Sequence, residues 1–561
     1  MKDIIALGIH IGHDRCAAVI KNGSLIGSIA QERVDRIKHS SSSEIPYEAI
    51  EKLLEYLSID ISTISYIGIT FSSVNARELE CYFYEELSRH YPNATFTVVP
   101  VSHHQAHAEI AYGTSDFDKA LILVADGGGD CVNGQYEAES LFIGNGDQIS
   151  LLEQRYQTPP VGSVEKMQNY IYPFMDKTTL DRQISIGRKY EQITYMLGFK
   201  WGECGKTMGL ASYGHPLWDV SKLGGHGLEF DLRLKNIVQE VYGRAIYSGK
   251  PYFTFLHEEG ANIAQTVQKA AEHLIVQCLK DLVSRYNIQN VCLAGGTFLN
   301  CMLNHKILEE IDGIRLHICP AAGDDGQAAG AAFAAYRKSG QSIQRTSAVL
   351  PYLGLSYENE DVLKTLMRTN LQYSYLEYSA LISEIAQQIR ANKIVAILRG
   401  KSEFGPRALG HRSILCNPAW SGMKDYLNER VKHREAFRPF APMVTYEDAF
   451  TIFDLRQDSP YMLLACQVRE NFRDKIPSVV HIDGTARVQT VHKETEPFLH
   501  ALLEEYKRIS GTAVLLNTSF NDNGQPMVES PVDAVSVFLN TNIDVLVMEN
   551  YIVSKLDKNM L

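Results

Sequence analysis

Short apolar runs separated by polar turns recur in the first part of the chain. Runs at 4–8, 16–20 and 25–30 predict three strands. Asn22-Gly23, between the last two runs, is a strong hairpin signal because both positions of such a turn need positive φ. The helical spacing of apolar residues at 46–57 then predicts a helix with one apolar face. The pattern therefore predicts a hairpin that leads into a helix.

The same order returns later in the first half. Runs at 120–125, 141–143 and 149–152 again predict strands, and Asn145-Gly146 lies between the last two. A polar turn at 126–130, of sequence Asp-Gly-Gly-Gly-Asp, follows the first strand of this second set. Such a duplicated α/β unit is typical of proteins of the actin, sugar-kinase and Hsp70 class, whose two turns face each other across a cleft that holds phosphate and metal. Two ordinary hairpins of an α/β domain are the simpler alternative.

A third segment, 291–300, reads as a buried strand that enters a Gly295-Gly296 turn and continues into a helix. Bare glycine backbone lets a ligand approach closely, and the N-terminus of a helix favours anions. The glycine pair is a weak signal by itself. Its position after the two predicted hairpins favours the actin-like interpretation.

Three histidines lie within five residues at 103–107, directly before the second predicted hairpin. On a helix, His103 and His107 share a face with their Cβ atoms about 5–6 Å apart, a spacing that suits two imidazoles on one ion. Asp126 ends the next strand, and Asp324 lies in a turn beyond the glycine pair. Two imidazoles with carboxylates and open positions suit a divalent transition metal such as iron(II) better than a closed structural zinc site. A histidine pair on a helix surface is the alternative.

The second half of the chain carries a different chemistry. A polar run at 337–342 predicts a linker. Beyond it, a strand predicted at 394–398 leads into a turn with Arg407, and further cations follow at later turns: Lys432, Arg434, Arg438 and Arg487. Cations on turns near strand ends of an acidic chain predict a focused anion site, because arginine forks match phosphate and carboxylate oxygens. A solvated basic surface is the alternative, and the sequence has no Walker pattern.

Charge and composition narrow the function classes. Lys and Arg number 54 against 66 Asp and Glu, a formal net charge of −12, which argues against a general affinity for nucleic acid. The start of the chain is too polar for a signal peptide, and no run approaches the roughly 18 apolar residues that span a membrane. The 10 cysteines form no paired Cys-x-x-Cys framework, so we expect reduced thiols in a cytoplasmic protein.

Several motifs together resemble one known family along nearly the whole chain. In chain order these are His13-Asp14, 32–39, 103–108, 205–211, Gly295-Gly296, the Asp324 turn, 405–410, 438–442 and 516–521. In these motifs the chain resembles the O-carbamoyltransferases of antibiotic and nodulation-factor biosynthesis, which include the tobramycin, cephalosporin and nodulation-factor enzymes. The last three motifs are highly specific in combination.

The resemblance implies two α/β domains. Residues 1–345 would form an actin-like, metal-binding carbamoyl-transfer domain similar to threonylcarbamoyl transferases. Residues 350–561 would form a carbamoyl-adenylate-forming domain similar to threonylcarbamoyl-adenylate synthase. There, carbamoyl phosphate would be hydrolysed to carbamate, which attacks ATP, with Mg²⁺ as its counterion, to give carbamoyl-adenylate and pyrophosphate. The carbamoyl group would then pass to a hydroxyl of a small molecule.

The resemblance also implies residue roles. His13 matches the general base, and Lys38 lies where a cation would stabilise developing charge. An imidazole, with an ordinary pKa of about 6.5, suits a base for a weakly acidic alcohol. Iron(II), or another divalent transition metal, would be bound by His103, His107, Asp126 and Asp324. The carbamoyl group and phosphates would be held by Arg407, Lys432, Arg438, Arg487, Asn517 and Ser519. Nucleotide contacts in the first domain would come from Gly205, Lys206, Gly295, Gly296 and Asn300.

Three other functions stay open at this point. They are a tRNA-modifying threonylcarbamoyl enzyme, an actin-like ATPase or sugar kinase with an appended domain, and a non-catalytic binding protein. The acidic balance disfavours tRNA, and a kinase does not account for the histidine pair or the arginines. The chain departs from the family at Cys16, at Phe298 and in a stretch at 208–263 that is short for the family. These departures concern the pocket for the acceptor. The identity of the acceptor and the oligomeric state stay open.

Overall fold

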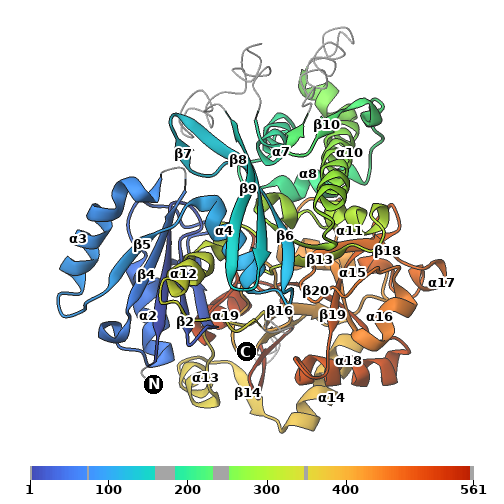
Figure 1. The fold of residues 1–561 in the computed structure, drawn as a ribbon. Helices are drawn as coiled ribbons and strands as arrows, with labels where there is room; N and C mark the ends of the chain where they lie inside the picture. The colour runs from blue at the N-terminus through green and yellow to red at the C-terminus, as the bar shows by residue number, and fades with distance from the viewer. Residues whose placement is uncertain (1–2, 73–74, 158–183, 231–251, 346–350, 556–561) are drawn as a thin grey trace. The chain divides into compact units, whose positions relative to one another are not determined.

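The computed structural model describes residues 3–72, 75–157, 184–230, 252–345 and 351–555 (Figure 1). The chain forms two compact units. Unit 1 comprises Met1–Gly12, Asn22–Ser24 and Ile64–Ser347, and unit 2 comprises His13–Lys21, Leu25–Thr63 and Ala348–Leu561. Strands and helices alternate in both units, so the predicted α/β fold class is confirmed.

The first predicted hairpin forms as expected. Its strands are β2 (Cys16–Lys21) and β3 (Ser24–Ala30), and β1 (Ile5–Ile11) precedes them. Asn22 and Gly23 have φ of 51° and 86°, so both turn positions lie in the left-handed region that an Asn-Gly turn requires. The predicted helix is α2 (Tyr47–Leu57).

The second predicted hairpin forms with longer strands and a displaced turn. Its strands are β6 (Lys119–Ala125), β8 (Gln135–Asn145) and β9 (Gln148–Gln157). Asn145 pairs with Gln148, so the loop is Gly146-Asp147. Of the loop residues only Gly146 has positive φ, at 56°, as in a type II′ turn. The prediction that Asn145 occupies the turn with positive φ is therefore wrong, because the strand extends through it.

Unit 1 repeats one arrangement of parallel strands and helices. β1, β4 (Tyr66–Phe71) and β5 (Thr97–Pro100) are parallel neighbours, and so are β6, β12 (Asn290–Ala294) and β13 (Arg315–Ile318). Each set ends in a buried helix, α4 (His103–Gly113) after β5 and α12 (Gln327–Arg337) after β13. α12 packs on β1 and β4, α4 packs on β6 and β12, and the two helices pack on each other.

The close crossing of α4 and α12 depends on a glycine. A Cβ at Gly330 would lie 1.9 Å from the backbone oxygen of Ala106, so no larger residue fits without moving a helix. The strip of small residues along α12 is buried throughout, from Gln327 to Tyr336. This crossing fixes the start of α12 beside α4, where the first candidate site lies.

The remaining elements of unit 1 flank these two sets. They are η2 (Ala76–Leu79), α3 (Glu80–His90), β7 (Cys131–Val132), α7 (Ile186–Met196), α8 (Cys204–Ala211), η4 (Val220–Lys222), β10 (Gly225–His226), β11 (Glu229–Phe230), α10 (Tyr252–Tyr286), η5 (Gly296–Leu299), α11 (Cys301–Glu310) and η6 (Asp324–Gly326). The stretch at 208–263 that is short for the family includes 231–251, which lie outside the described residues.

Unit 2 contains a nine-stranded mixed sheet. Its strand order is β14-β22-β21-β15-β16-β20-β17-β19-β18. The strands are β14 (Gln372–Tyr375), β15 (Val395–Leu398), β16 (Arg412–Cys416), β17 (Ala441–Thr445), β18 (Leu464–Gln467), β19 (Thr485–Val491), β20 (Val514–Ser519), β21 (Val545–Met548) and β22 (Tyr551–Ser554). The helices of this unit are α1 (Glu32–Asp35), α2, α13 (Asn359–Leu366), α14 (Tyr378–Arg390), α15 (Met423–Leu427), α16 (Tyr446–Ile452), α17 (Glu470–Arg473), α18 (Pro497–Ser510) and α19 (Pro531–Asn540), with the short helices η1 (Ile61–Thr63), η7 (Asn428–Lys432) and η8 (Pro477–Val479).

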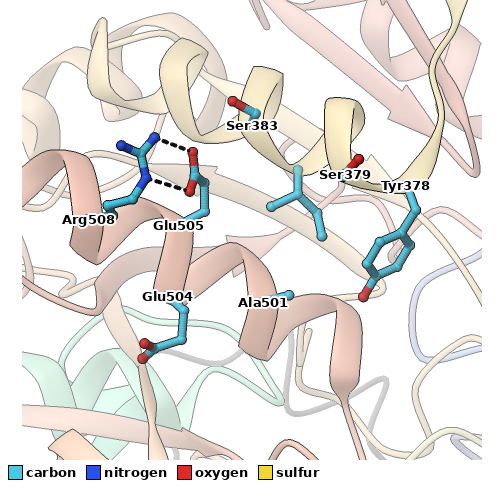
Figure 2. A pocket seen from close by; sticks show the side chains of 8 residues that line it. Tyr378, Ser379, Ser383, Ala501, Glu504, Glu505 and Arg508 are labelled. Atoms are coloured by element: carbon cyan, nitrogen blue, oxygen red, sulfur yellow. Dashed lines mark hydrogen bonds and ion pairs between the residues drawn. The ribbon is translucent and has the colours of Figure 1, made fainter.

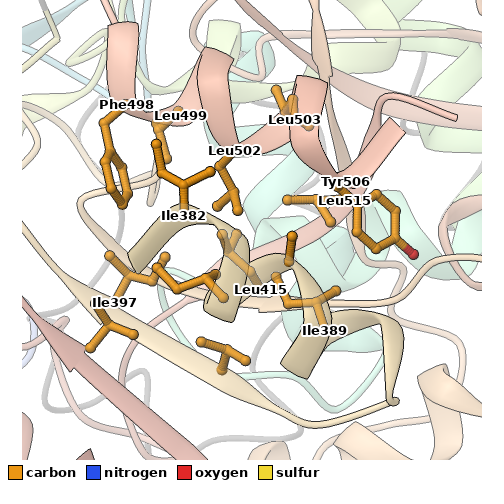
Figure 3. Close-up of a cluster of buried hydrophobic side chains, with 14 of the residues drawn as sticks. Ile382, Ile389, Ile397, Leu415, Phe498, Leu499, Leu502, Leu503, Tyr506 and Leu515 are labelled. Atoms are coloured by element: carbon orange, nitrogen blue, oxygen red, sulfur yellow. The ribbon is translucent and has the colours of Figure 1, made fainter. Parts of the chain in front are cut away.

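Helices α14 and α18 cover the central strands of this sheet. Figure 3 shows their apolar side chains meeting residues of β15, β16 and β20. Leu381, Ile385, Leu502 and Leu415 are all fully buried there. Since a buried Leu or Ile side chain contributes about 1.5–3 kcal/mol, this cluster is a main source of stability for the sheet that carries the second candidate site.

The segment around α1 belongs to unit 2. Arg36 donates to the backbone oxygens of Met527 and Pro526, and its Nε lies 3.5 Å from Asp533 Oδ1. Arg33 reaches Val528 O and lies 4.0 Å from Glu529. A boundary at 345–350 alone therefore does not separate the two compact units, although the division of activities between 1–345 and 350–561 stays a prediction.

Two composition-based expectations bear on the described residues. None of the helices in the described ranges combines the length and apolar character needed to cross a bilayer. All ten cysteines are free thiols, as predicted from the lack of a paired framework.

Candidate functional site

The first candidate site of unit 1 is built on the buried start of α4. Ser102 caps this helix by accepting a hydrogen bond from the Gln105 N–H. His103 and His107, one turn apart, are 1% and 0% exposed. Asp126 follows the last residue of β6, and Asp324 opens η6 directly before α12. The α4–α12 crossing therefore brings together residues more than 200 positions apart.

The four side chains converge on one point. His103 Nε2 lies 3.2 Å from Asp126 Oδ2 and 3.4 Å from Asp324 Oδ1. His107 Nε2 lies 3.3 Å from Asp324 Oδ1 and 3.9 Å from Asp126 Oδ2. One ligand atom from each residue lies within 4.8 Å of all the others.

This donor set fits a divalent metal. The Nε2 of His107 is buried, and no group in the described part of the chain makes a hydrogen bond to it. A buried polar atom that makes no hydrogen bond is costly, and a cation between the two imidazoles and two carboxylates would satisfy it. Two imidazole nitrogens with two carboxylate oxygens suit a divalent transition metal.

The Gly295-Gly296 turn orients Asp126. The Gly296 N–H donates to Asp126 Oδ1 at 3.0 Å, which leaves Oδ2 facing His103. Gly295 has φ of 99°, and a Cβ there would lie 2.2 Å from the backbone oxygen of Ala125. Glycine is therefore required for β6 and this turn to approach each other. The turn supports the candidate metal site directly, a role that the sequence pattern did not show.

His10 and Ser72 are two further residues of this site that sequence reasoning missed. Both are buried, at the ends of β1 and β4. Ser72 Oγ lies 3.1 Å from His10 Nε2 and 3.4 Å from Asp324 Oδ2. They contact the oxygen of Asp324 that faces away from His107, so they orient this carboxylate. The signal for His10 was a single histidine within an otherwise apolar strand.

The other predicted residues of unit 1 have local partners. Asn300 caps α11 by accepting the Leu303 N–H at 3.1 Å, and its amide donates to Gln268 at 2.8 Å. Lys206, next to Gly205 on α8, forms an ion pair with Glu203 at 2.7 Å. Their nucleotide-binding roles stay predictions.

The second candidate site lies at the end of β20 in unit 2. Lys432 is buried, and its ammonium donates to the backbone oxygen of Ser519 and to the backbone and side-chain oxygens of Asn521. Burial, with the nearby charges of Arg434 and Arg438, holds the pKa of Lys432 well below 10.5. Lys432 therefore orders the residues after β20 and lies beside a group of cations that disfavours its own charge.

Three arginines complete this cationic cluster. Burial and the charges of Arg438 and Arg487 lower the pKa of the Arg434 guanidinium to about 9. Arg434 also lies over the Phe440 ring, 4.1 Å from its centroid, and donates to Pro439 O. Like charges held this close in a partly buried place are stabilised by a bound anion. Arg434 is one of the cations from which the sequence predicts an anion site, although the family resemblance gives it no role.

The turn that carries Arg407 is fixed against β20 and β19. The Asn517 amide donates to Ala408 O at 3.1 Å and to Gln489 Oε1 at 2.8 Å. Gln489 in turn donates to Leu409 O at 2.7 Å. Asn517 thus links the Arg407 turn to the strand that ends at Ser519. The backbone next to Arg407 and the residues that Lys432 contacts are therefore both held by β20.

Glu403 stabilises the turn that carries Arg407 by binding its backbone. Its buried Oε1 accepts the N–H groups of Leu409, His411 and Arg412 at 2.9–3.0 Å. We expect Glu403→Ala to lower the free energy of unfolding by about 2–4 kcal/mol, because three buried donors lose a charged acceptor. Urea unfolding followed by circular dichroism measures this. Glu504→Ala, on the exposed face of α18, should stay within about 0.5 kcal/mol; equal losses for both variants would contradict this role of Glu403.

His13 belongs to unit 2, where Asp14 holds it. Asp14 Oδ2 lies 3.2 Å from His13 Nδ1, and Oδ1 lies 2.8 Å from His39 Nδ1. Glu32 accepts the backbone N–H of His39 at 2.9 Å, and Lys38 is exposed beside it. Atoms of Asp14, Glu32 and His39 also lie within 4.8 Å of one another. Hydrogen bonds explain why these three side chains lie close together, since each Asp14 oxygen faces an imidazole and Glu32 accepts from His39.

A surface groove between α14 and α18 has a different character (Figure 2). Its polar groups include the Arg508–Glu505 ion pair, at 2.7 Å on one helix face. The Arg508 side chain is 67% exposed, and pairs of this kind contribute little free energy. Among the residues that line this groove, no buried polar side chains converge as they do at the two sites above.

Comparison with known proteins matches two segments of the chain to family models. The family model described as Carbamoyltransferase N-terminus matches residues 91–333, and the one described as Carbamoyltransferase C-terminus matches 386–555. The nodulation protein NolNO of Sinorhizobium fredii is 31% identical over 97% of this chain and 79% of its own length. The nodulation protein NolO of Bradyrhizobium diazoefficiens is 31% identical over 81% of this chain and 79% of its own.

Among solved structures, HypF of T. kodakarensis aligns with a TM-score of 0.41 at 15% identity, over 60% of this chain and 48% of that one. The four residues of the first site all fall in the N-terminal match, and Arg407 and the cationic cluster fall in the C-terminal match. The family resemblance predicted from the motifs is confirmed. The chain belongs to the carbamoyltransferase family and is a carbamoyltransferase.

Proposed function

We propose that the chain is an ATP-dependent O-carbamoyltransferase that forms carbamoyl-adenylate and transfers its carbamoyl group to a hydroxyl of a small-molecule natural product. One observation carries this proposal. Each segment that matches a family model contains its own cluster of reactive groups, of opposite chemical character. The N-terminal segment has the histidine–carboxylate cluster, and the C-terminal segment has the cationic cluster. Two chemical steps with different needs account for both.

The cationic cluster suits the activation step. Water would release carbamate from carbamoyl phosphate, with phosphate as the leaving group. A carbamate oxygen would then attack the α-phosphorus of ATP, and the bond to pyrophosphate breaks to leave carbamoyl-adenylate. Arg407, Arg434, Arg438 and Arg487 would neutralise the phosphates, since guanidinium forks match their oxygens, and Mg²⁺ would accompany ATP. Lys432, Asn517 and Ser519 support this arrangement through the hydrogen bonds at the end of β20.

The histidine–carboxylate cluster suits the transfer step. The acceptor oxygen would attack the carbamoyl carbon, AMP would leave, and His13 would take the hydroxyl proton as general base. Lys38 would stabilise the developing charge. A divalent metal would be bound by His103, His107, Asp126 and Asp324, and this donor set favours iron(II). The metal would act as a Lewis acid on the carbamoyl carbonyl or adenylate oxygens. We also propose that transfer belongs to 1–345 and activation to 350–561.

Product analysis tests this function against its alternatives. The protein would be incubated with ATP, Mg²⁺, isotopically labelled carbamoyl phosphate and a panel of hydroxylated acceptors, which includes aminoglycosides and oligosaccharides. We expect AMP, pyrophosphate, phosphate and an acceptor that carries the label, all identified by mass spectrometry. A sugar kinase would give ADP and a phosphorylated acceptor, and a threonylcarbamoyl enzyme would modify tRNA only when threonine is added. Either of those results would contradict the proposal.

A further inference from the structure

Two turns of unit 2 meet at the Asp14 carboxylate. Arg15 ties them together: its backbone N–H donates to Ser40 O at 3.3 Å, and its guanidinium donates to Ser40 Oγ at 2.9 Å. The Ser40 hydroxyl donates to Asp35 at 2.6 Å. Asp14 precedes Arg15 and His39 precedes Ser40, so these bonds hold Asp14 and His39 side by side. That is how Asp14 and His39 come to share a hydrogen bond.

The backbone at these two positions is unusual. Asp14 and His39 have φ of 55° and 54°, in the left-handed region that non-glycine residues rarely adopt. Such conformations cost on the order of 1 kcal/mol each and persist where the surrounding structure imposes them. Both side chains thereby face the same place, and the Asp14 carboxylate accepts one imidazole on each oxygen.

The charges around this carboxylate are unequal on its two sides. Burial would raise the pKa of Asp14, but the hydrogen bonds from His13 and His39 hold it well below 3.8. The bond to Asp14 raises the pKa of His39 above 6.5, with Glu32 favouring and Lys38 opposing the charge. His39 is the closer imidazole, at 2.8 Å against 3.2 Å for His13. The carboxylate is therefore neutralised mainly from the His39 side.

We propose that Asp14 is a positioning residue that orients His13 through Nδ1, and that His39 balances the Asp14 charge so that His13 stays neutral and able to accept a proton. A carboxylate beside a single imidazole favours the protonated imidazolium, which cannot act as a base. A general base works best when it titrates near the working pH. The second imidazole lets Asp14 fix the tautomer and the ring orientation of His13 without protonating it.

This inference rests on the proposed function only in that it takes His13 as the base; the arrangement itself has a direct test. The full-length protein would carry ¹³C-labelled histidine, and the His13 signal would be identified by its loss in His13→Gln. Its titration would be followed by NMR in His39→Gln, His39→Lys, Asp14→Asn and Lys52→Gln. Lys52 is an exposed residue of α2 and serves as the surface charge control.

The variants should move the His13 titration in opposite directions. His39→Gln leaves Asp14 unbalanced, so the midpoint should rise by about half a pH unit, the size expected for a part-exposed pair. Asp14→Asn removes the negative charge, so the midpoint should fall. His39→Lys restores a cation and should return the midpoint toward that of the unmodified protein, and Lys52→Gln should leave it unchanged. A structural role alone would not produce opposite shifts.

Two outcomes separate this inference from the proposed function. If His39→Gln and Asp14→Asn leave the midpoint unchanged, or shift it the same way, the inference is wrong. If the midpoints move as expected and the acid limb of the rate of acceptor carbamoylation moves with them, both stand. If the midpoints move but the acid limb does not, His13 is not the base, and the proposed function loses that role while the charge balance is retained.

Discussion

Replacing His13 with alanine should lower the rate of acceptor carbamoylation about 10²–10⁴-fold, the usual contribution of a general base. Pyrophosphate release from ATP and carbamoyl phosphate, measured without acceptor, should be unchanged in the same variant. The reason is that we assign activation to the cationic cluster at the end of β20 and the role of general base in the transfer step to His13. His13→Asn would distinguish loss of the base from loss of a hydrogen bond.

Arg407→Ala is the matched variant for the other step. It removes a charged contact to an anionic substrate, which costs about 1.5–3 kcal/mol, so pyrophosphate release should fall at least about tenfold. If His13→Ala abolished pyrophosphate release as fully as Arg407→Ala does, the division into two steps would be wrong. If it left carbamoylation intact, Lys38 or a metal-bound hydroxide would be the better candidate for the base.

Replacing His107 with alanine should strip the metal and abolish acceptor carbamoylation. His107 is fully buried and reaches both carboxylates of the cluster, so no solvent-exposed group can take its place. Loss of one of two imidazoles leaves two carboxylates and a single nitrogen, a poor set for a transition metal. Elemental analysis of anaerobically purified protein measures the metal content directly.

His90→Ala, on the exposed end of α3, is the control for a histidine of the same unit. It should retain both the metal and the activity. A protein that is fully active without bound metal would contradict the role given to this cluster. Pyrophosphate release should survive in His107→Ala, because the cationic cluster lies in unit 2.

Local features of the fold followed well from the sequence. The Asn22-Gly23 turn, the strands around it and α2 depend on neighbours in the chain, and the structure has them as predicted. The helical spacing of His103 and His107 is likewise a local property of α4. The turn at Gly146 was displaced because pairing of β8 with β9 continues through Asn145, and pairing between strands is not encoded in a two-residue signal.

Contacts between residues far apart in the chain could be predicted from the sequence only where a family motif contained the residues. Asp324 was recognised by its motif, yet His10 and Ser72, which lie against it, were not. Their role depends on α12 packing over β1 and β4, a contact between segments more than 200 residues apart. The order of the nine strands in unit 2 and the support of the Arg407 turn by Glu403 depend on such packing too.

Formation of carbamoyl-adenylate without an acceptor is the most direct test of the proposed function. The full-length protein would be mixed with ATP, Mg²⁺ and carbamoyl phosphate, then quenched and analysed by mass spectrometry for the adenylate and by enzymatic assay for pyrophosphate. We predict that both products form and that neither forms when carbamoyl phosphate is left out. ADP in place of pyrophosphate, or carbamoylation of an acceptor in the absence of ATP, would contradict the account.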